Sequence, residues 1–239
     1  MKRTTITGLA CVLAMLAVPV AAQNIDRLQN LAQSEFRLLS EDLGGALSYH
    51  PQLPTEPLGV TGFDAGLAVT MARIRNLDVL KRASSDSVPS TVPIPMLRID
   101  KGLPLGFDVG ALYSKVPGTD ISFWGVQARY AILKGGVTQP AVGVRASYTK
   151  LNGVDELDLH TKGLDISASK GFAMFTPYIG VGRVWVNSDP HVSNLSNEDF
   201  GLNKVFVGAG FKFFLLNLNA EVDRTGPSTA YSLKAGIRF

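Results

Sequence analysis

The stretch that decides the fold is YSLKAGIRF, residues Tyr231–Phe239. Apolar residues occupy every second position, and the residues between them are polar, charged or small: first Tyr231, Leu233, Ala235, Ile237 and Phe239, then Ser232, Lys234, Gly236 and Arg238. A period of two predicts a β-strand with one apolar and one polar face. We expect this strand to pair with the first strand of a closed barrel, which leaves no free edge.

The same alternation recurs from Leu58 onward and predicts about ten strands. Seven of the segments are regular: 62–72, 105–114, 123–132, 140–149, 204–214, 216–223 and 231–239. Three are less regular, at 92–101, 157–170 and 175–188. Pro93 and Pro95 weaken the start of the first of these. The pattern changes phase near Gly163 and near Arg183, where we expect bulges.

The polar face of these strands is rich in glycine, at Gly66, Gly110, Gly125, Gly143, Gly208, Gly210 and Gly236. Its charges are of both signs: Asp64, Asp108, Asp165, Glu221 and Asp223 against Arg129, Arg145, Lys204, Lys212, Lys234 and Arg238. Small residues and paired charges suit the inside of a narrow barrel. The apolar face would then meet lipid, as in a transmembrane barrel. A soluble lipocalin-like barrel is the alternative.

Connections and aromatic residues also favour a membrane barrel. The links before strands two and eight are long, whereas those before strands three, five, seven and nine are short. Outer-membrane barrels have short periplasmic turns and longer external loops. Two aromatic girdles follow from this topology. The external girdle holds Tyr113, Trp124, Tyr148, Trp185 and Tyr231, and the periplasmic girdle holds Phe63, Phe107, Phe175, Phe211, Phe213 and Phe239.

Residues 1–22 have the pattern of a secretory signal peptide, with Lys2 and Arg3 before an apolar run. A membrane anchor and lipidation of Cys11 are the alternatives, and the run is short for an anchor. Without this segment the formal net charge falls from +3 to +1, so the composition predicts no nucleic-acid partner. The predicted division is 1–22 signal peptide, 23–57 N-terminal segment and 58–239 barrel.

Residues 24–43 carry leucines and isoleucine at helical spacing, and Gly44 and Gly45 are expected to weaken or end the helix. The Pro-rich linker HPQLPTEP, residues 50–57, follows. We expect the segment to plug the lumen, with Leu28, Leu31 and Leu39 against the wall, or to lie across the periplasmic mouth.

The closing strand and the signal-like start together resemble Gram-negative outer-membrane β-barrels, in which the final strand is read by the barrel-assembly machinery. EFRLLSEDLGGALSYHPQLPTEPLGVTGFDAG and TKGLDISASKGFAMFTPYIGVGRVW are similar to a family of uncharacterised bacterial outer-membrane barrels. A looser likeness links the N-terminal segment to fatty-acid channel barrels. These resemblances imply a fold, an outer-membrane location, lipid contact and recognition of the strand that ends in Phe239, but no activity.

The chain has three histidines, at His50, His160 and His191, and none has metal-ligand spacing. We expect a solvated His50 and a polar contact for His160 in the lumen or at the rim. The sequence His191-Val192-Ser193-Asn194 resembles the H-x-S-N element of outer-membrane lipid A deacylases, which implies a His191 base and a Ser193 nucleophile. Glu198 or Asp199 would then orient His191.

An omptin-type protease, which would use His191 with rim acids to activate water, is a further alternative. The preferred hypothesis is non-enzymatic, without catalytic, cofactor-binding or metal-binding residues. It is a passive outer-membrane barrel: a narrow channel, a binding barrel for small molecules, hydrophobic ones included, or a structural protein.

Overall fold

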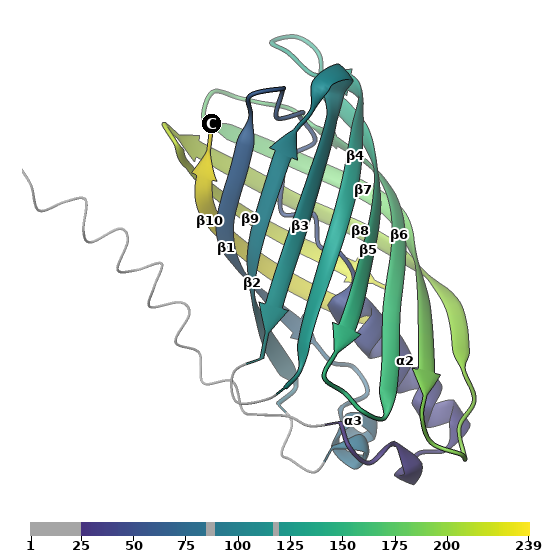
Figure 1. Ribbon diagram of the computed structural model, residues 1–239. Coiled ribbons are helices and arrows are strands. Elements are labelled where there is room, and N and C mark those ends of the chain that lie inside the picture. The colour runs from purple at the N-terminus through teal and green to yellow at the C-terminus, as the bar shows by residue number, and fades with distance from the viewer. Residues whose placement is uncertain (1–24, 85–88, 117–119) are drawn as a thin grey trace, which may run out of the picture.

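The chain forms a closed antiparallel barrel of ten strands, in the order β1-β10-β9-β8-β7-β6-β5-β4-β3-β2. The computed structural model describes residues 25–84, 89–116 and 120–239, so the predicted signal peptide lies outside the described residues. Each strand pairs with its neighbours along the chain, and β1 closes on β10 (Figure 1). The predicted strand number and up-and-down topology are therefore confirmed.

The strands are long for a soluble sheet and of a length that spans a membrane when tilted. They are β1 Phe63–Arg73, β2 Thr91–Gly102, β3 Phe107–Lys115, β4 Ser122–Lys134, β5 Ala141–Asn152, β6 Leu157–Ser169, β7 Phe175–Pro190, β8 Glu198–Phe213, β9 Leu216–Thr225 and β10 Ser228–Arg238. The helical elements are η1 Leu28–Asn30, α2 Gln33–Leu47, α3 Leu77–Ala83 and η2 Pro104–Gly106. No helix of the described part is long and apolar enough to cross a membrane.

The outer wall of the barrel is apolar, and the inner wall is polar. In β9, Leu216, Leu218 and Val222 are exposed, whereas the residues between them, Asn217, Asn219, Glu221 and Asp223, are buried. An apolar surface that points away from the core suits lipid and not water. The structure therefore agrees with a transmembrane barrel and not with a lipocalin-like one. The chain has the fold of an outer-membrane β-barrel.

The two ends of the barrel differ. Links of two to six residues join β2–β3, β4–β5, β6–β7 and β8–β9, and we call this the short-turn end. The opposite end, the long-loop end, carries residues 74–90 with α3 and residues 191–197. Phe239 lies at the short-turn end, whereas α2 and α3 lie toward the long-loop end (Figure 1). By the rule for outer-membrane barrels, the long-loop end faces outward from the cell.

The N-terminal residues 25–62, here called the plug, pass through the barrel interior, with exposed residues near both ends of the segment. Ile25 bridges to Ser84 at the long-loop end, and Phe63 begins β1 at the short-turn end. The plug therefore traverses the lumen from one end to the other (Figure 1). Leu28, Leu31 and Leu39 are buried, but Leu28 lies in η1 and Leu31 precedes α2, so the three do not share one helix face.

The predicted helix 24–43 has the wrong bounds. A 3-10 turn, η1, precedes α2, which begins at Gln33 and continues through Gly44 and Gly45 to Leu47. An added Cβ on Gly44 would lie 2.5 Å from Val186 Cγ2, and one on Gly45 would lie 2.5 Å from Ser228 Cβ. The two glycines therefore let the helix approach the wall closely. This tertiary contact outweighs their low helix propensity.

The bulges expected near Gly163 and Arg183 are absent, since the pairing of β6 with β7 runs without a register shift. Among the described strands, the register shifts between Ala131 and Leu133 of β4. Instead, the apolar residues of β6 lie on the inner face at one end of the strand and on the outer face further along. Leu157 and Leu159 point inward at the long-loop end, and Leu164 and Ile166 point outward further along β6. The lumen is apolar where it surrounds α2.

The end of β10 closes the barrel through a reciprocal contact. Phe63 N donates to Phe239 O at 2.9 Å, and Phe239 N donates to Phe63 O at 3.0 Å. The two rings lie 5.7 Å apart between centroids. The register of β1 with β10 then runs from Asp64 opposite Arg238 to Arg73 opposite Thr229. The predicted pairing of the last strand with the first is confirmed.

Candidate functional site

An apolar cavity of about 90 Å³ lies inside the barrel at the long-loop end. It is bounded by α2, by the inner faces of β2, β4 and β5, and by the links of that end. Its lining in the described part of the chain is Ile25, Leu43, Ala46, Leu47, Ile74, Leu80, Ser84, Val92, Ile94, Val116, Ile121, Phe123, Leu151 and Val154. Thirteen of these fourteen side chains are apolar. The cavity therefore suits an apolar group and not an ion or a polar solute.

α2 is fixed at this end by Asp42, which is fully buried. Its carboxylate accepts hydrogen bonds from Asn76 N at 2.7 Å, from Asn76 Nδ2 at 3.1 Å and from Arg75 N at 3.4 Å. Burial raises the pKa of the Asp42 carboxyl, and the hydrogen bonds from Asn76 and Arg75 oppose that rise. The contact ties α2 to the first turn of α3, so it holds one wall of the cavity in place.

Beyond α2 the lumen becomes polar, and the wall binds the backbone of the plug. The Pro-rich linker forms no regular structure, so its carbonyl groups need partners from elsewhere. Wall cations supply them. Lys204 Nζ donates to Tyr49 O, Arg98 Nη1 to His50 O, and Arg129 Nη1 to Pro54 O.

Backbone N–H groups of the plug find wall acceptors in the same way. Gln52 N donates to Glu221 Oε2 at 2.7 Å, and Leu58 N donates to Asp108 Oδ1 at 3.0 Å. Small residues of the wall make room for the plug, since an added Cβ on Gly210 would lie 2.9 Å from Pro54 Cγ. The inward charges therefore serve to hold the plug as well as to pair with one another.

Three ion pairs join wall strands inside the barrel: Asp64 with Lys234, Asp108 with Arg129, and Arg145 with Asp165. All six side chains are buried. The prediction of an interior with paired charges of both signs is confirmed for these residues. A buried charge without a partner would cost several kcal/mol, so such pairing is required in a filled lumen.

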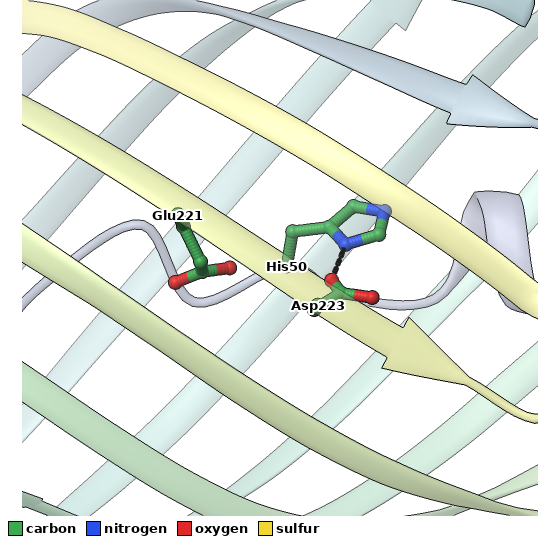
Figure 2. A group of neighbouring side chains, drawn as sticks. All are labelled: His50, Glu221 and Asp223. Atoms are coloured by element: carbon green, nitrogen blue, oxygen red, sulfur yellow. Dashed lines mark hydrogen bonds and ion pairs between the residues drawn. The ribbon is translucent and has the colours of Figure 1, made fainter.

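His50 lies in this polar zone and is 2% exposed, so the expectation of a solvated histidine is wrong. Its Nδ1 hydrogen-bonds Asp223 Oδ2, and its Nε2 lies 3.1 Å from Ala46 O (Figure 2). Both of these partners are acceptors. His50 therefore joins the last turn of α2 to β9. The proline-rich context gave no signal of this contact, which depends on a strand 173 residues away.

His50, Glu221 and Asp223 have potential ligand atoms within 4.8 Å of one another, which is the spacing of a possible metal site. His50 Nδ1 is already bonded to Asp223 (Figure 2). Glu221 Oε2 accepts from Gln52 N and, at 2.8 Å, from Tyr178 Oη. His50 Nδ1, Asp223 Oδ2 and Glu221 Oε2 are thus engaged by protein partners, and only Glu221 Oε1 of this group is buried without a hydrogen bond. The buried ammonium of Lys204 lies in the same zone. The cluster fits a charge-paired anchor for the plug better than it fits a metal centre.

His191 and Ser193 of the predicted deacylase-like motif lie exposed in the 191–197 link. His191 Nδ1 lies 2.8 Å from Asp155 O, and Nε2 lies 3.4 Å from Asp158 Oδ2. Within this fully described link, no hydrogen bond joins His191 to Ser193.

The proposed orienting acids have other partners, since Glu198 pairs with Arg37 and Asp199 accepts from Asn187. The structure therefore does not assemble the base–nucleophile pair that hydrolysis requires. His160 lies on the outer wall with its ring centroid 5.7 Å from that of Tyr148, which is a contact between rings and not the predicted polar contact.

No known family description matches the chain, and no curated protein matches it. Solved outer-membrane barrels resemble it in outline. The KdgM porin is 13% identical, with a TM-score of 0.37 over 74% of this chain and 99% of that one. The outer membrane protease OmpT from Escherichia coli is 9% identical, with a TM-score of 0.37 over 74% and 95%. Neisserial surface protein A is 13% identical, with a TM-score of 0.28 over 74% and 94%.

Sequence identities and TM-scores this low carry no argument about activity. The similar structures also include both a porin and a protease. The assignment as an outer-membrane barrel rests on the closed sheet and its lipid-facing wall. The looser likeness to fatty-acid channels gains no support from these neighbours.

Proposed function

We propose that this protein is a closed, non-catalytic outer-membrane barrel that binds a small apolar molecule in the cavity beside α2. The observation that carries the proposal is the cavity itself: about 90 Å³, lined by thirteen apolar side chains and Ser84. An apolar cavity of about 150 Å³ in another protein stays dry and binds benzene. The space here suits a short alkyl group or a small ring.

The plug makes an open channel the weaker hypothesis. It passes through the lumen, and wall residues of both signs hold its backbone along the way. The charged residues of both signs in the interior are therefore explained by their contacts with the plug, and no conducted solute is needed to explain them. The plug leaves the cavity at the long-loop end unfilled, and a passive binding role would place the ligand there.

The proposal is tested with benzene as the probe and methyl NMR of the detergent-solubilised full chain as the readout. Benzene should shift the methyl signals of Ile94 and Leu151, which line the cavity, in a saturable way. Methyl signals of Leu164, on the outer wall, report unspecific partition into the detergent. Equal, unsaturable shifts at all three residues would reject the binding site.

A matched pair of variants sharpens the test. Ala46→Leu fills the cavity from α2, and we expect it to abolish the saturable shift. Ala128→Leu makes the same change on the exposed outer face of β4 and should leave the shift unchanged. Retention of saturable binding in Ala46→Leu, with the fold intact by heat-modifiable gel mobility, would place the ligand elsewhere.

A further inference from the structure

A basic groove marks the outer wall of the barrel near the long-loop end. It has a volume of about 340 Å³ and lies across β6, β7 and β8. Its outward side chains include His160, Lys162, Trp185, Asn187 and Asp199. The wall on this side faces lipid, so the groove is open to the bilayer and not to the lumen.

Cations of neighbouring strands gather at the groove. Lys150 of β5 stands opposite His160, and Lys162 stands opposite both Tyr148 and Trp185. Side chains that face each other across antiparallel strands are about 5 Å apart at Cβ. Lys150 and Lys162 therefore lie on the same patch, at the level of the aromatic residues.

Arg183 joins them because β8 carries a glycine beside it. Arg183 lies two residues before Trp185 on β7, and Gly201 stands opposite Trp185 on β8. An added Cβ on Gly201 would lie 2.6 Å from Arg183 Nε and 2.8 Å from its Nη2. The guanidinium therefore lies over the glycine, along the wall and toward the groove. Any larger residue at this position would push it away.

These cations have no protein partner, whereas the nearby acids do. Lys150, Lys162 and Arg183 make no side-chain hydrogen bond or ion pair with the part of the chain that the structure describes. Asp199 accepts from Asn187 Nδ2 at 2.6 Å, and Asp158 lies 3.4 Å from His191 Nε2. Asn187 is neutral, so Asp199 keeps its charge within the groove. The patch therefore carries three cations beside two carboxylates, and among the described residues the cations are the groups left without a hydrogen-bonded partner.

The depth of the patch in the membrane indicates which anionic ligand its cations meet. Trp124, Tyr148 and Trp185 share its level, and such aromatics mark the border between the hydrocarbon and the headgroups. Toward the short-turn end the same strands expose a continuous apolar surface, formed by Leu164, Ile166, Ile179, Val181, Val205 and Val207. A ligand with an anionic head and acyl chains would meet both surfaces at once.

We propose that this groove is a binding site for the phosphorylated headgroup of a lipid in the external leaflet. Lys150, Lys162 and Arg183 bind the phosphate oxygens, Trp185 packs beside the head, and the apolar surface below receives the acyl chains. The proposal is independent of the cavity, because the groove and the cavity lie on opposite sides of the barrel wall.

The test uses the full chain in detergent and bisphosphorylated lipid A as the probe. Trp124 and Trp185 are the two tryptophans of the sequence, so Trp124→Phe leaves Trp185 as the fluorescent reporter. In this background the triple change Lys150→Gln, Lys162→Gln and Arg183→Gln should weaken binding at least about tenfold. The matched control is Arg73→Gln, Lys115→Gln and Arg224→Gln, which removes three outward cations of the same end on other strands.

Two further experiments distinguish binding of a phosphorylated lipid from binding of any phosphate anion. Lipid A without its phosphates should bind at least about tenfold more weakly than the bisphosphorylated form, and inorganic phosphate should not displace it at millimolar concentration. Full competition by inorganic phosphate would show a simple anion site and overturn the lipid assignment. Equal affinity of the two triple variants would show that general charge, and not this groove, attracts the lipid.

Discussion

His50 of the plug and Asp223 of β9 are hydrogen-bonded to each other inside the barrel, and both are at least 97% buried. Replacing His50 with Ala leaves the Asp223 carboxylate without its main partner. Leaving a buried charge without its partner costs about 3–5 kcal/mol. We therefore expect His50→Ala to lower the denaturant midpoint clearly and to make the plug accessible to protease.

The double variant His50→Ala with Asp223→Ala provides the control. It removes both partners, so it should be less destabilised than the sum of the two single variants. Strictly additive free energies of unfolding would show that the two residues do not act as a pair.

We expect Gly44 to be required for the close packing of α2 against the barrel wall. Gly44→Ala places a Cβ 2.5 Å from Val186 Cγ2, and overpacking of this kind costs about 1–3 kcal/mol. The added Val186→Ala change removes the clash and should recover part of the loss. Gly136→Ala, at a position with open space, is the matched control and should be near neutral. Thermal unfolding measures all three, and equal effects of Gly44→Ala and Gly136→Ala would contradict the close packing.

Removal of the plug should open the barrel. In planar bilayers we expect no steady conductance from the full chain, because residues 25–62 occupy the lumen. Deletion of residues 23–57 should produce a steady cation- or anion-permeable pore, provided that heat-modifiable gel mobility shows a folded barrel. A steady conductance of the full chain equal to that of the deletion variant would contradict a sealed lumen.

The long-loop end should be accessible from outside the cell. Ser196 lies in the 191–197 link, and Val137 is 98% exposed in the turn between β4 and β5 at the other end. A membrane-impermeant maleimide should label Ser196→Cys on intact cells and leave Val137→Cys unlabelled until the cells are broken. The reverse pattern would invert the orientation. Unsubstituted protein, whose sequence has Cys11 alone, gives the background.

The contact of Phe239 with Phe63 should matter for assembly. Phe239→Ala removes a ring that is 60% exposed on the outer wall, so it should affect insertion more than packing. We expect severalfold less folded protein in the outer membrane, in line with the proposed recognition of this strand by the assembly machinery. Phe214→Ala, in the turn between β8 and β9, is the control, with a ring that is 83% exposed. Equal accumulation of the two variants would reject the special role of Phe239.

The sequence by itself determined the barrel. Alternation of apolar and polar residues is local, so residues such as Leu216 and Asn217 assign the two faces of a strand without any knowledge of its neighbours. The glycine-rich polar face and the unequal links then distinguished a membrane barrel from a soluble one. Ten strands, the closure of β10 on β1 and the aromatic levels followed from these patterns.

Only the tertiary structure decided how the lumen is used. The extension of α2 through Gly44 and Gly45 depends on Val186 and Ser228, and the burial of His50 depends on Asp223. The alternation changes phase near Gly163 and Arg183 because the inward residues around α2 are apolar. The strands themselves keep their register there. Contacts between residues more than a hundred positions apart have no local signature, so the cavity, the plug anchors and the basic groove became visible only in three dimensions.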